Sequence, residues 1–291
     1  MNQPLFKGTC TALVTPFLNG MVNYPLMEQL LRRQIDSGIH TVVLCGTTGE
    51  SPTLSDEEKI NIFHRAKQFV ADECMIIAGT GSNNTEHAVK LSVAAEKAGA
   101  DALLIVSPYY NKATPEGLID HYSTIASAVH IPVILYNVPS RTGLDIPVSV
   151  YKQLSLIPNI AGVKEASSDI SKIARIRAAC PQDFCIWSGN DDQATAVMSL
   201  GGCGVISVLS NIFPEQVQSM ISAALDGDFD TASDIQIQML PITEALFQEV
   251  NPIPVKAAMG LLGYDCGMCR PPLSPVSEVL LKKIQRLLSA V

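Results

Sequence analysis

The chain has 291 residues, of which 47% are hydrophobic and 16% charged, and its formal net charge is −8. This composition is typical of a protein with a large core, and the length suits one α/β barrel of about 250 residues. Because no basic run occurs, nucleic acids and anionic membranes are excluded as favoured partners. Small anionic substrates remain possible, since a few local cationic groups suffice to hold them.

The N-terminal segment and the cysteines indicate a cytoplasmic protein. The first ten residues lack the charged and then apolar layout of a signal peptide, and no apolar run reaches membrane-spanning length. Most of the eight cysteines lie in or beside apolar runs, as inert thiols of a reducing compartment do. Cys266 and Cys269 have a CxxC spacing, but no second pair or nearby histidine completes a zinc site. We therefore expect no metal.

Eight apolar runs recur along the chain at intervals of roughly 20 to 35 residues, close to one βα unit each. None alternates cleanly between apolar and polar residues, which is typical of parallel strands covered on both faces. The strands are predicted at residues 10–17, 41–47, 75–80, 102–108, 132–139, 160–167, 184–190 and 204–210.

Helix-like segments lie between these runs and carry start and end signals. Ser55 and Glu58 form a capping-box pattern, and Pro115 follows Thr114 at the first position of another helix. Further helix starts are predicted at Asp169, Asp191 and Pro214, and helix ends at Gly38 and Gly99.

Eight successive βα units with right-handed crossovers predict a (β/α)8 TIM barrel of the α/β class. The segment beyond the barrel is too long for one closing helix, and we expect helices at 229–250, 252–262 and 275–291. The predicted organisation is a barrel over 1–225 with C-terminal helices over 226–291 packed on it. A doubly wound open sheet is the alternative, but it usually shows a glycine-rich phosphate turn early in the chain.

Lys164 lies inside the apolar run 160–166, which otherwise has the character of a buried strand. Lysine is almost never fully buried without a partner, because removing an ammonium group from water is costly. Desolvation lowers the pKa of an ammonium group and favours the neutral amine, which is a nucleophile towards carbonyl compounds. On this run alone, that interpretation is balanced against a strand-end lysine whose head reaches solvent.

In barrels of this type, chemistry is carried by the carboxyl ends of the strands and by the loops that follow them. Thr47 and Thr48 lie between glycines and offer hydroxyl and N–H groups to a carboxylate, although an ordinary turn uses the same residues. Tyr136, on the strand before that of Lys164, is suited to proton transfer or to a place in the core. Arg141 is suited to grip a carboxylate, or else is a solvated surface residue.

Four segments together resemble the class I pyruvate-dependent aldolases related to N-acetylneuraminate lyase, and the resemblance covers nearly the whole chain. They are Gly-Thr-Thr-Gly-Glu at 46–50, Tyr-Asn-Val-Pro at 136–139, Gly-Val-Lys at 162–164 and Gly-Asn-Asp at 189–191. Within this group, Ser-Arg-Thr-Gly at 140–143 is most similar to the dihydrodipicolinate synthase family, because the sialic-acid lyases lack that arginine.

The resemblance implies an imine between pyruvate and Lys164, then condensation with L-aspartate 4-semialdehyde. Cyclisation with loss of water would give 4-hydroxy-tetrahydrodipicolinate, on the diaminopimelate and lysine pathway. No separate cofactor is implied, because the imine is itself the electron sink. The residues implied beside Lys164 are Tyr136, Thr47 and Tyr110 for proton transfer, and Thr48, Arg141, Ile206 and Gly189 for substrate binding.

The resemblance also implies a homotetramer, arranged as a dimer of dimers, in which Tyr110 crosses to a neighbouring subunit. Family members that lysine inhibits hold its ammonium group with a glutamate and histidines. This chain has Asp56, Lys59 and His87 at those positions, so we expect weak or no inhibition by lysine. Two alternatives remain open: a related aldolase or lyase for a 2-keto-3-deoxy sugar acid, and a non-catalytic barrel that binds a keto acid.

Overall fold

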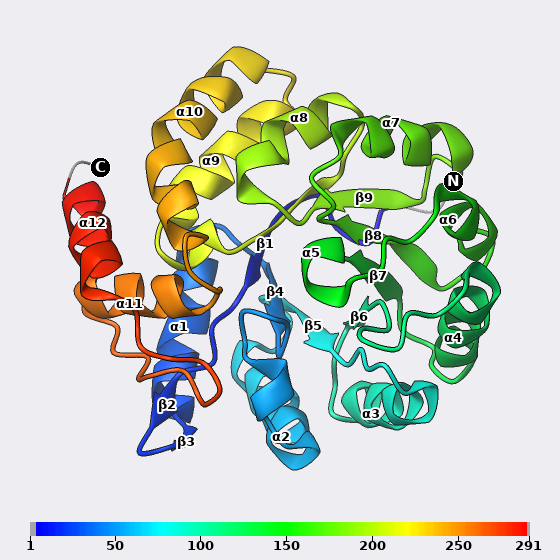
Figure 1. The fold of residues 1–291 in the computed structure, drawn as a ribbon, viewed down its shortest axis with the longest axis horizontal. Coiled ribbons are helices and arrows are strands. Elements are labelled where there is room, and N and C mark those ends of the chain that lie inside the picture. The colour runs from blue at the N-terminus through cyan, green and yellow to red at the C-terminus, as the bar shows by residue number, and fades with distance from the viewer. Residues whose placement is uncertain (1–3, 290–291) are drawn as a thin grey trace.

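The computed structural model describes residues 4–289, and its centre is a closed barrel of parallel strands (Figure 1). Around the barrel the strands follow the order β1-β10-β9-β8-β7-β6-β5-β4, and β4 pairs with β1. The predicted TIM barrel is confirmed, and the open sheet is excluded. The barrel strands are β1 (Gly8–Ala12), β4 (Thr41–Leu44), β5 (Met75–Gly79), β6 (Ala102–Val106), β7 (Val133–Asn137), β8 (Ile160–Glu165), β9 (Cys185–Ser188) and β10 (Gly204–Ser207).

Helices surround the barrel and cover the outer face of its strands (Figure 1). Short 3-10 turns, η1 (Ser51–Thr53), η2 (Asp191–Gln193) and η3 (Leu209–Asn211), lie in the loops after β4, β9 and β10. The surrounding helices are α1 (Tyr24–Asp36), α2 (Asp56–Val70), α3 (Thr85–Lys97), α4 (Pro115–Ser127), α6 (Val148–Leu154), α7 (Ile170–Ala179), α8 (Ala194–Ser199) and α9 (Pro214–Leu225). The short helix α5 (Pro139–Thr142) lies instead at the carboxyl end of β7 (Figure 1).

Most helix signals in the sequence are confirmed. The Ser55 hydroxyl accepts the Glu58 N–H at 3.1 Å while the Glu58 carboxylate accepts the Ser55 N–H at 2.9 Å, which completes the capping box of α2. Thr114 caps α4, and Asp169 caps α7. Pro214 begins α9, and Gly38 and Gly99 follow the ends of α1 and α3 with positive φ.

The first strand is shorter than predicted, since β1 ends at Ala12 rather than at residue 17. Pro16 has no N–H to donate to a ladder, and the Phe17 N–H donates to the Cys266 carbonyl in the C-terminal segment. The chain then forms a small antiparallel hairpin, β2 (Phe17–Leu18) and β3 (Met21–Val22), before α1. Closer to the end of β1, the Val14 N–H donates to the Asn211 side chain at 3.1 Å, so contacts distant in sequence take up the backbone beyond Ala12.

Side chains of the barrel strands alternate between an outer cluster under the helices and an inner cluster. On β7, Leu135 belongs to the outer cluster and Tyr136 to the inner one. Phe6, two residues before β1, stacks on the Trp187 side chain of β9 with ring centroids 4.6 Å apart, and the pair fills part of the inner space. In barrels of this type a site lies at the carboxyl ends of the strands.

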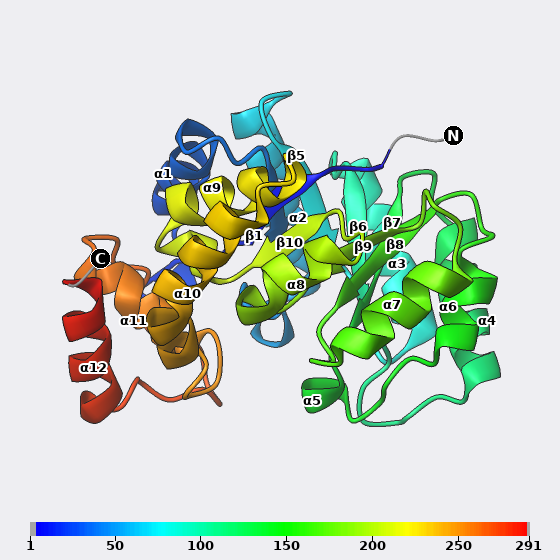
Figure 2. The same ribbon diagram turned by 90° about the horizontal axis from the view of Figure 1, so that it is seen from above.

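The C-terminal extension consists of α10 (Phe229–Leu246), α11 (Ile253–Leu261) and α12 (Glu278–Leu288). The three predicted helices are confirmed, although residues 290 and 291 of the last lie outside the described range. Figure 2 shows them on the side of α1 and α9, away from α4 and α6. No helix within residues 4–289 combines the length and apolar character that a membrane crossing requires. The division at residues 225 and 226 stays a prediction.

A buried ion pair joins this extension to the barrel. The Lys256 ammonium, on α11, donates to the Glu50 carboxylate at 2.9 Å and to the Thr15 carbonyl at 3.1 Å. The two charged side chains are 2% and 0% exposed. Glu50 also accepts the backbone N–H of Arg270 at 2.8 Å. The extension is thus anchored directly after the Thr47-Thr48 turn.

We predict that Lys256→Met lowers the free energy of unfolding by about 3–5 kcal/mol, because it leaves the Glu50 carboxylate buried without its counter-charge. Urea denaturation monitored by circular dichroism measures the change. Lys282→Met, at an exposed position of α12, is the control and should change it by about 0.5 kcal/mol or less. Equal stability of the two variants would contradict the anchoring role.

Candidate active site

Lys164 and Tyr136 lie directly opposite each other on neighbouring strands. The register of β7 and β8 pairs the two residues, and both side chains point into the barrel. Lys164 is 5% exposed and Tyr136 6%. The Lys164 Nζ lies 4.5 Å from the centre of the Tyr136 ring, and within residues 4–289 it has no hydrogen bond or ion pair. A buried, unpaired amine at this end of a barrel is suited to attack a carbonyl group.

Space around the amine depends on Gly189, at the end of β9. A Cβ atom at this position would lie 2.7 Å from the Ala166 Cβ and 3.1 Å from the Lys164 Cε. Any other residue would therefore displace the lysine side chain or its strand. The predicted substrate-binding glycine is close enough to shape the surroundings of Lys164, and its contact with a substrate stays a prediction.

Asp191 begins the 3-10 turn η2 that leads into α8, in agreement with the predicted helix start, and its side chain is buried. Its Oδ2 atom accepts the N–H groups of Val208 at 2.9 Å and Leu209 at 3.1 Å, so it holds the turn after β10. Its Oδ1 atom has no hydrogen-bond partner among the described residues. Burial raises the pKa of this carboxyl, and the neighbouring Ser207 hydroxyl and the N–H groups of the turn partly offset the effect. The role of the Asp191 side chain is therefore set by contacts with residues distant in sequence, which the local sequence pattern does not reveal.

A cavity of about 290 Å³ lies at the carboxyl ends of β4 to β7. Its lining contains one lysine, Lys59, and one arginine, Arg141, but no aspartate or glutamate of the described chain. An anionic ligand therefore meets cations and hydroxyl groups without a repelling carboxylate. The lining residues are Cys45, Gly46, Thr47, Ser51, Pro52, Lys59, Gly79, Gly81, Ser82, His87, Leu104, Val106, Tyr109, Tyr136, Val138, Arg141 and Thr142.

The other predicted binding residues differ in their relation to this cavity. Arg141 lies on the short helix α5 rather than in a loop, and Thr47 is half-buried at the lining. Thr48 is buried behind Thr47, and its hydroxyl accepts the Asn251 side-chain amide at 3.0 Å. Ile206 lies on the inner face of β10, fully buried. Neither Thr48 nor Ile206 is among the lining residues.

Asn251 was not singled out by the sequence, although it contacts two predicted site residues. Besides its bond to Thr48, its carbonyl accepts the Arg141 guanidinium at 3.4 Å. Its side-chain oxygen is buried and unpartnered among the described residues. The only signal in the local sequence is an asparagine before a proline, and that pattern does not by itself point to a site.

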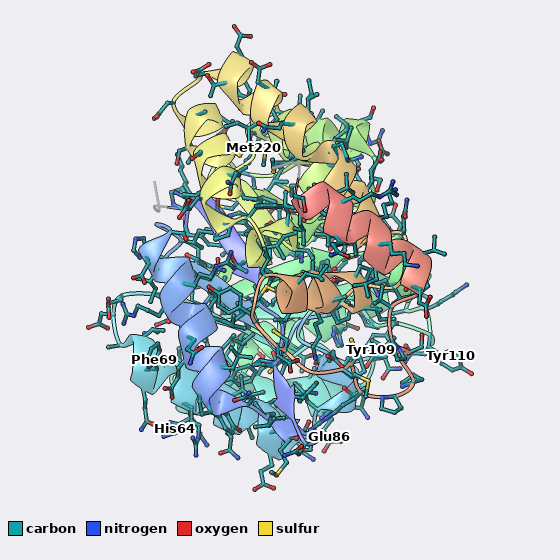
Figure 3. All side chains as sticks on the ribbon, turned by 90° about the vertical axis from the view of Figure 1, so that its left-hand side faces the viewer. His64, Phe69, Glu86, Tyr109, Tyr110 and Met220 are labelled. Atoms are coloured by element: carbon teal, nitrogen blue, oxygen red, sulfur yellow. The ribbon has the colours of Figure 1, made fainter. Side chains whose placement is uncertain are left out.

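Tyr110 is not brought to Lys164 within one chain. It is 90% exposed with φ of +72°, whereas its neighbour Tyr109 lines the cavity. Figure 3 shows both tyrosines at the edge of the molecule. The Tyr136 hydroxyl makes no hydrogen bond to a residue of the range 4–289. The proton relay through Thr47 and Tyr110 therefore stays a prediction.

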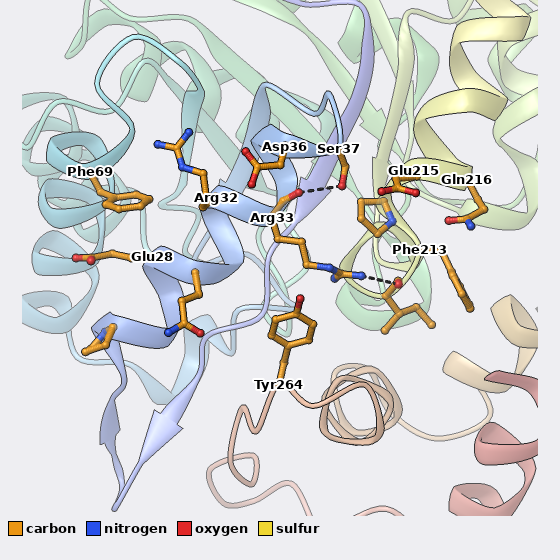
Figure 4. Close-up of a pocket in the computed structure, with 14 residues that line it drawn as sticks. Glu28, Arg32, Arg33, Asp36, Ser37, Phe69, Phe213, Glu215, Gln216 and Tyr264 are labelled. Atoms are coloured by element: carbon orange, nitrogen blue, oxygen red, sulfur yellow. Dashed lines mark hydrogen bonds between the residues drawn. The ribbon is translucent and has the colours of Figure 1, made fainter. Parts of the chain in front are cut away.

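A larger cavity of about 930 Å³ lies on the outer surface, between α1 and the start of α9 (Figure 4). Arg33 in this cavity donates to the carbonyls of Asn211 and Ile212 and lies 5.0 Å from the centre of the Tyr264 ring. Arg32, the other arginine of the lining, pairs with Glu73 at 2.9 Å, so both arginines are already engaged in structural contacts. We take the smaller cavity as the candidate active site because it lies at the carboxyl ends of the strands, although it is not the larger of the two.

The CxxC cysteines lie in the C-terminal segment, where Cys266 is buried and Cys269 is half-buried. Burial raises the pKa of Cys266 to about 12 and that of Cys269 to about 11, so both thiols stay protonated at neutral pH. Among residues 4–289, no group of three or more histidine, cysteine, aspartate or glutamate side chains is arranged to hold a metal ion.

Comparison with known proteins gives one consistent family. A 4-hydroxy-tetrahydrodipicolinate synthase of Thermoanaerobacter sp. (strain X514) is 47% identical over 288 residues, which are 99% of this chain and 97% of the relative. The structure of the dihydrodipicolinate synthase from Cyanidioschyzon merolae with lysine bound is 39% identical, with a TM-score of 0.96 and 99% of both chains covered.

A structure described as the first monomeric dihydrodipicolinate synthase variant is also 39% identical, with a TM-score of 0.96 over 98% of this chain and 96% of the other. The family model for the dihydrodipicolinate synthetase family matches residues 5–291. On the match over almost its full length, the chain belongs to the dihydrodipicolinate synthetase family.

Proposed function

We propose that this protein is a lyase that condenses pyruvate with L-aspartate 4-semialdehyde to give 4-hydroxy-tetrahydrodipicolinate, for diaminopimelate and lysine biosynthesis. The family and the names of its relatives support the reaction. The observation that carries the mechanism is the buried, unpaired Lys164 amine opposite Tyr136. A cytoplasmic location is part of the proposal and is supported by eight free cysteines.

Lys164 begins the reaction by attacking the C2 carbonyl of pyruvate. The carbinolamine loses water to give an imine, and removal of a C3 proton gives the enamine. The enamine carbon attacks the aldehyde of the second substrate, whose oxygen takes up a proton. The amino group of that substrate then attacks C2 and displaces Lys164, which closes the ring and restores the free amine. One water molecule is released overall.

Tyr136 is the proposed proton donor and acceptor, because it is the hydroxyl-bearing side chain directly opposite the amine. Thr47 and Tyr110 are proposed to relay protons to it. We assign Thr48, the Ile206 backbone and Gly189 to pyruvate and the reacting atoms, and Arg141 to the carboxylate of the second substrate. The cation-lined cavity supports binding of two carboxylate-bearing substrates.

We predict that pyruvate with borohydride inactivates the enzyme and adds one reduced pyruvyl group to Lys164. The buried amine of Lys164 is the proposed nucleophile, and reduction makes the imine permanent. Peptide mass spectrometry locates the group. The control is Lys164→Met, which should remain unmodified and inactive. A group located on another lysine, with full activity retained in Lys164→Ala, would refute the proposed function.

We predict that Arg141→Ala weakens the apparent affinity for L-aspartate 4-semialdehyde roughly ten- to a hundred-fold, with little effect on pyruvate. The loss of a charge-assisted contact to a carboxylate, about 1.5–3 kcal/mol, sets this range. Steady-state kinetics with each substrate varied in turn measures both effects. Arg175→Ala, which removes an exposed arginine paired with Asp169, is the control. An equal loss for both substrates would indicate structural damage.

We also propose a homotetramer, a dimer of dimers in which Tyr110 completes the site of a neighbouring subunit. The exposure of Tyr110 and its distance from the cavity of its own chain support this arrangement. The monomeric variant among the relatives makes the oligomeric state a question for experiment.

We predict that mixing inactive Tyr110→Phe with inactive Lys164→Ala subunits restores part of the activity, because a mixed dimer contains one complete site. Activity is measured after subunit exchange has been confirmed by native mass spectrometry. Mixing Tyr136→Phe with Lys164→Ala is the matched control and should restore none, since both changes affect residues of one chain's site. No recovery with Tyr110→Phe would place that tyrosine in its own chain.

We predict weak or absent inhibition by lysine, with half-inhibition well above about a millimolar. Asp56 is already engaged by His87 at 2.8 Å and lies 3.8 Å from the Lys59 ammonium, which would repel that of the ligand. Initial rates at saturating pyruvate test this. The double variant Lys59→Met with His87→Glu should gain sensitivity. Half-inhibition of the unchanged enzyme below a millimolar would contradict the prediction.

A further inference from the structure

We infer that a buried polar network on the outer face of β7 and β8 is a positioning device for the reaction site, an inference that rests on the proposed function. The network lies behind the strands, under α6 and α7, and none of its members lines the cavity. Its members are Asn137, Asp145, Tyr151, Glu165 and Lys172.

Strand geometry places each inner site residue next to a member of this network. Successive side chains of a strand point to opposite faces, so Asn137 follows Tyr136 on the outside of β7 and Glu165 follows Lys164 on the outside of β8. The register pairs Asn137 with Glu165, as it pairs Tyr136 with Lys164. A shift in the position of the outer pair therefore moves the same backbone that carries the inner pair.

Glu165 is the centre of the network, with its side chain 1% exposed. Its Oε1 atom accepts the Asn137 amide at 2.8 Å and the Ser167 backbone N–H at 2.9 Å, and its Oε2 atom accepts the Tyr151 hydroxyl at 2.9 Å. The Lys172 ammonium lies 3.7 Å from Oε2. Donors on both sides leave the carboxylate little freedom, and the adjoining end of β8 is fixed with it.

Asn137 extends the same device to the segment that follows Arg141. Its amide donates to the Asp145 carboxylate at 2.7 Å, and its carbonyl oxygen accepts the Ile146 N–H at 3.0 Å. Lys172 forms an ion pair with Asp145. The chain leaving α5 is thus tied to the end of β7. The network therefore holds the ends of the two strands that carry Tyr136 and Lys164, and it holds the segment that follows Arg141.

The location of the network argues for a role beyond stability. Buried ion pairs are weak contributors to stability, because desolvation offsets much of the attraction, and apolar residues fill such positions at least as well. Elsewhere on β7 and β8 the outer face is apolar, as at Leu135 and Val163. Polar groups replace apolar ones only behind the two proposed reacting side chains.

Tyr151 is the member that a mild substitution tests. It is fully buried, and its pKa is raised well above the ordinary value by burial and by the charge of Glu165, so the hydroxyl remains a donor. Tyr151→Phe removes this donor and retains the ring. Tyr122→Phe is the matched control, since Tyr122 is equally buried outside the barrel but bonds only the Ile105 carbonyl, at 3.5 Å.

The experiment measures the rate constant of imine formation with pyruvate, by rapid quench into borohydride, with folding checked by circular dichroism. We expect Tyr151→Phe to lower this rate constant and kcat roughly tenfold and to leave the modified residue, Lys164, unchanged. Tyr122→Phe should keep the rate within about twofold, because the Tyr122 hydroxyl makes no hydrogen bond to the network. Glu165→Gln, which keeps the shape but not the charge, should also slow the step.

Wild-type rates of imine formation in folded Tyr151→Phe would overturn the inference and leave the network a purely structural feature. The result for Tyr151→Phe decides the matter if Glu165→Gln does not fold. Failure of the unchanged protein to form any adduct at Lys164 is a separate outcome, because it would refute the proposed function itself. A loss in kcat and imine formation shared equally by Tyr122→Phe would also overturn the inference, since it would show general sensitivity to hydroxyl removal.

Discussion

The interior of the barrel must hold the amine of Lys164 without a counter-ion, and much of the structure follows from this requirement. An ammonium group is costly to bury, and a carboxylate close to it would favour the charged form. Within the described residues no carboxylate forms an ion pair with the amine, which lies over the ring of Tyr136 instead. Gly189 leaves room for the side chain, and the stacked Phe6 and Trp187 fill part of the inner space of the barrel.

A parallel strand lets one segment serve two chemical environments. Lys164 and Tyr136 point inward, where reactivity requires few partners. Glu165 and Asn137 point outward, where every hydrogen-bonding atom of the carboxylate is used. The contrast is possible because adjacent side chains on a strand lie on opposite faces. The side chains of Lys164 and Tyr136 thus have few partners, while the next residue on each strand holds the backbone in place.

Local patterns in the sequence were sufficient for the elements and for the strand-end residues. Apolar runs marked the eight barrel strands, and the capping box at Ser55 located the start of α2. Lys164 was visible because a lysine in an apolar run is unusual. The end of β1, the role of Asp191 and the contacts of Asn251 were not predicted, because each depends on a partner far along the chain. Thr48 and Asn251, for example, are 203 positions apart.

These distant partners show why the barrel segment alone does not account for the site. The Thr47-Thr48 turn is bordered on one side by the bond from Asn251 to Thr48 and on the other by the buried pair of Glu50 and Lys256. Both partners come from the segment after residue 225. Without them, the Glu50 carboxylate would be buried with no cation, and a buried unpaired charge is not stable in that state. The C-terminal helices are therefore part of the structure that shapes the cavity, although the chemistry is assigned to residues of the barrel.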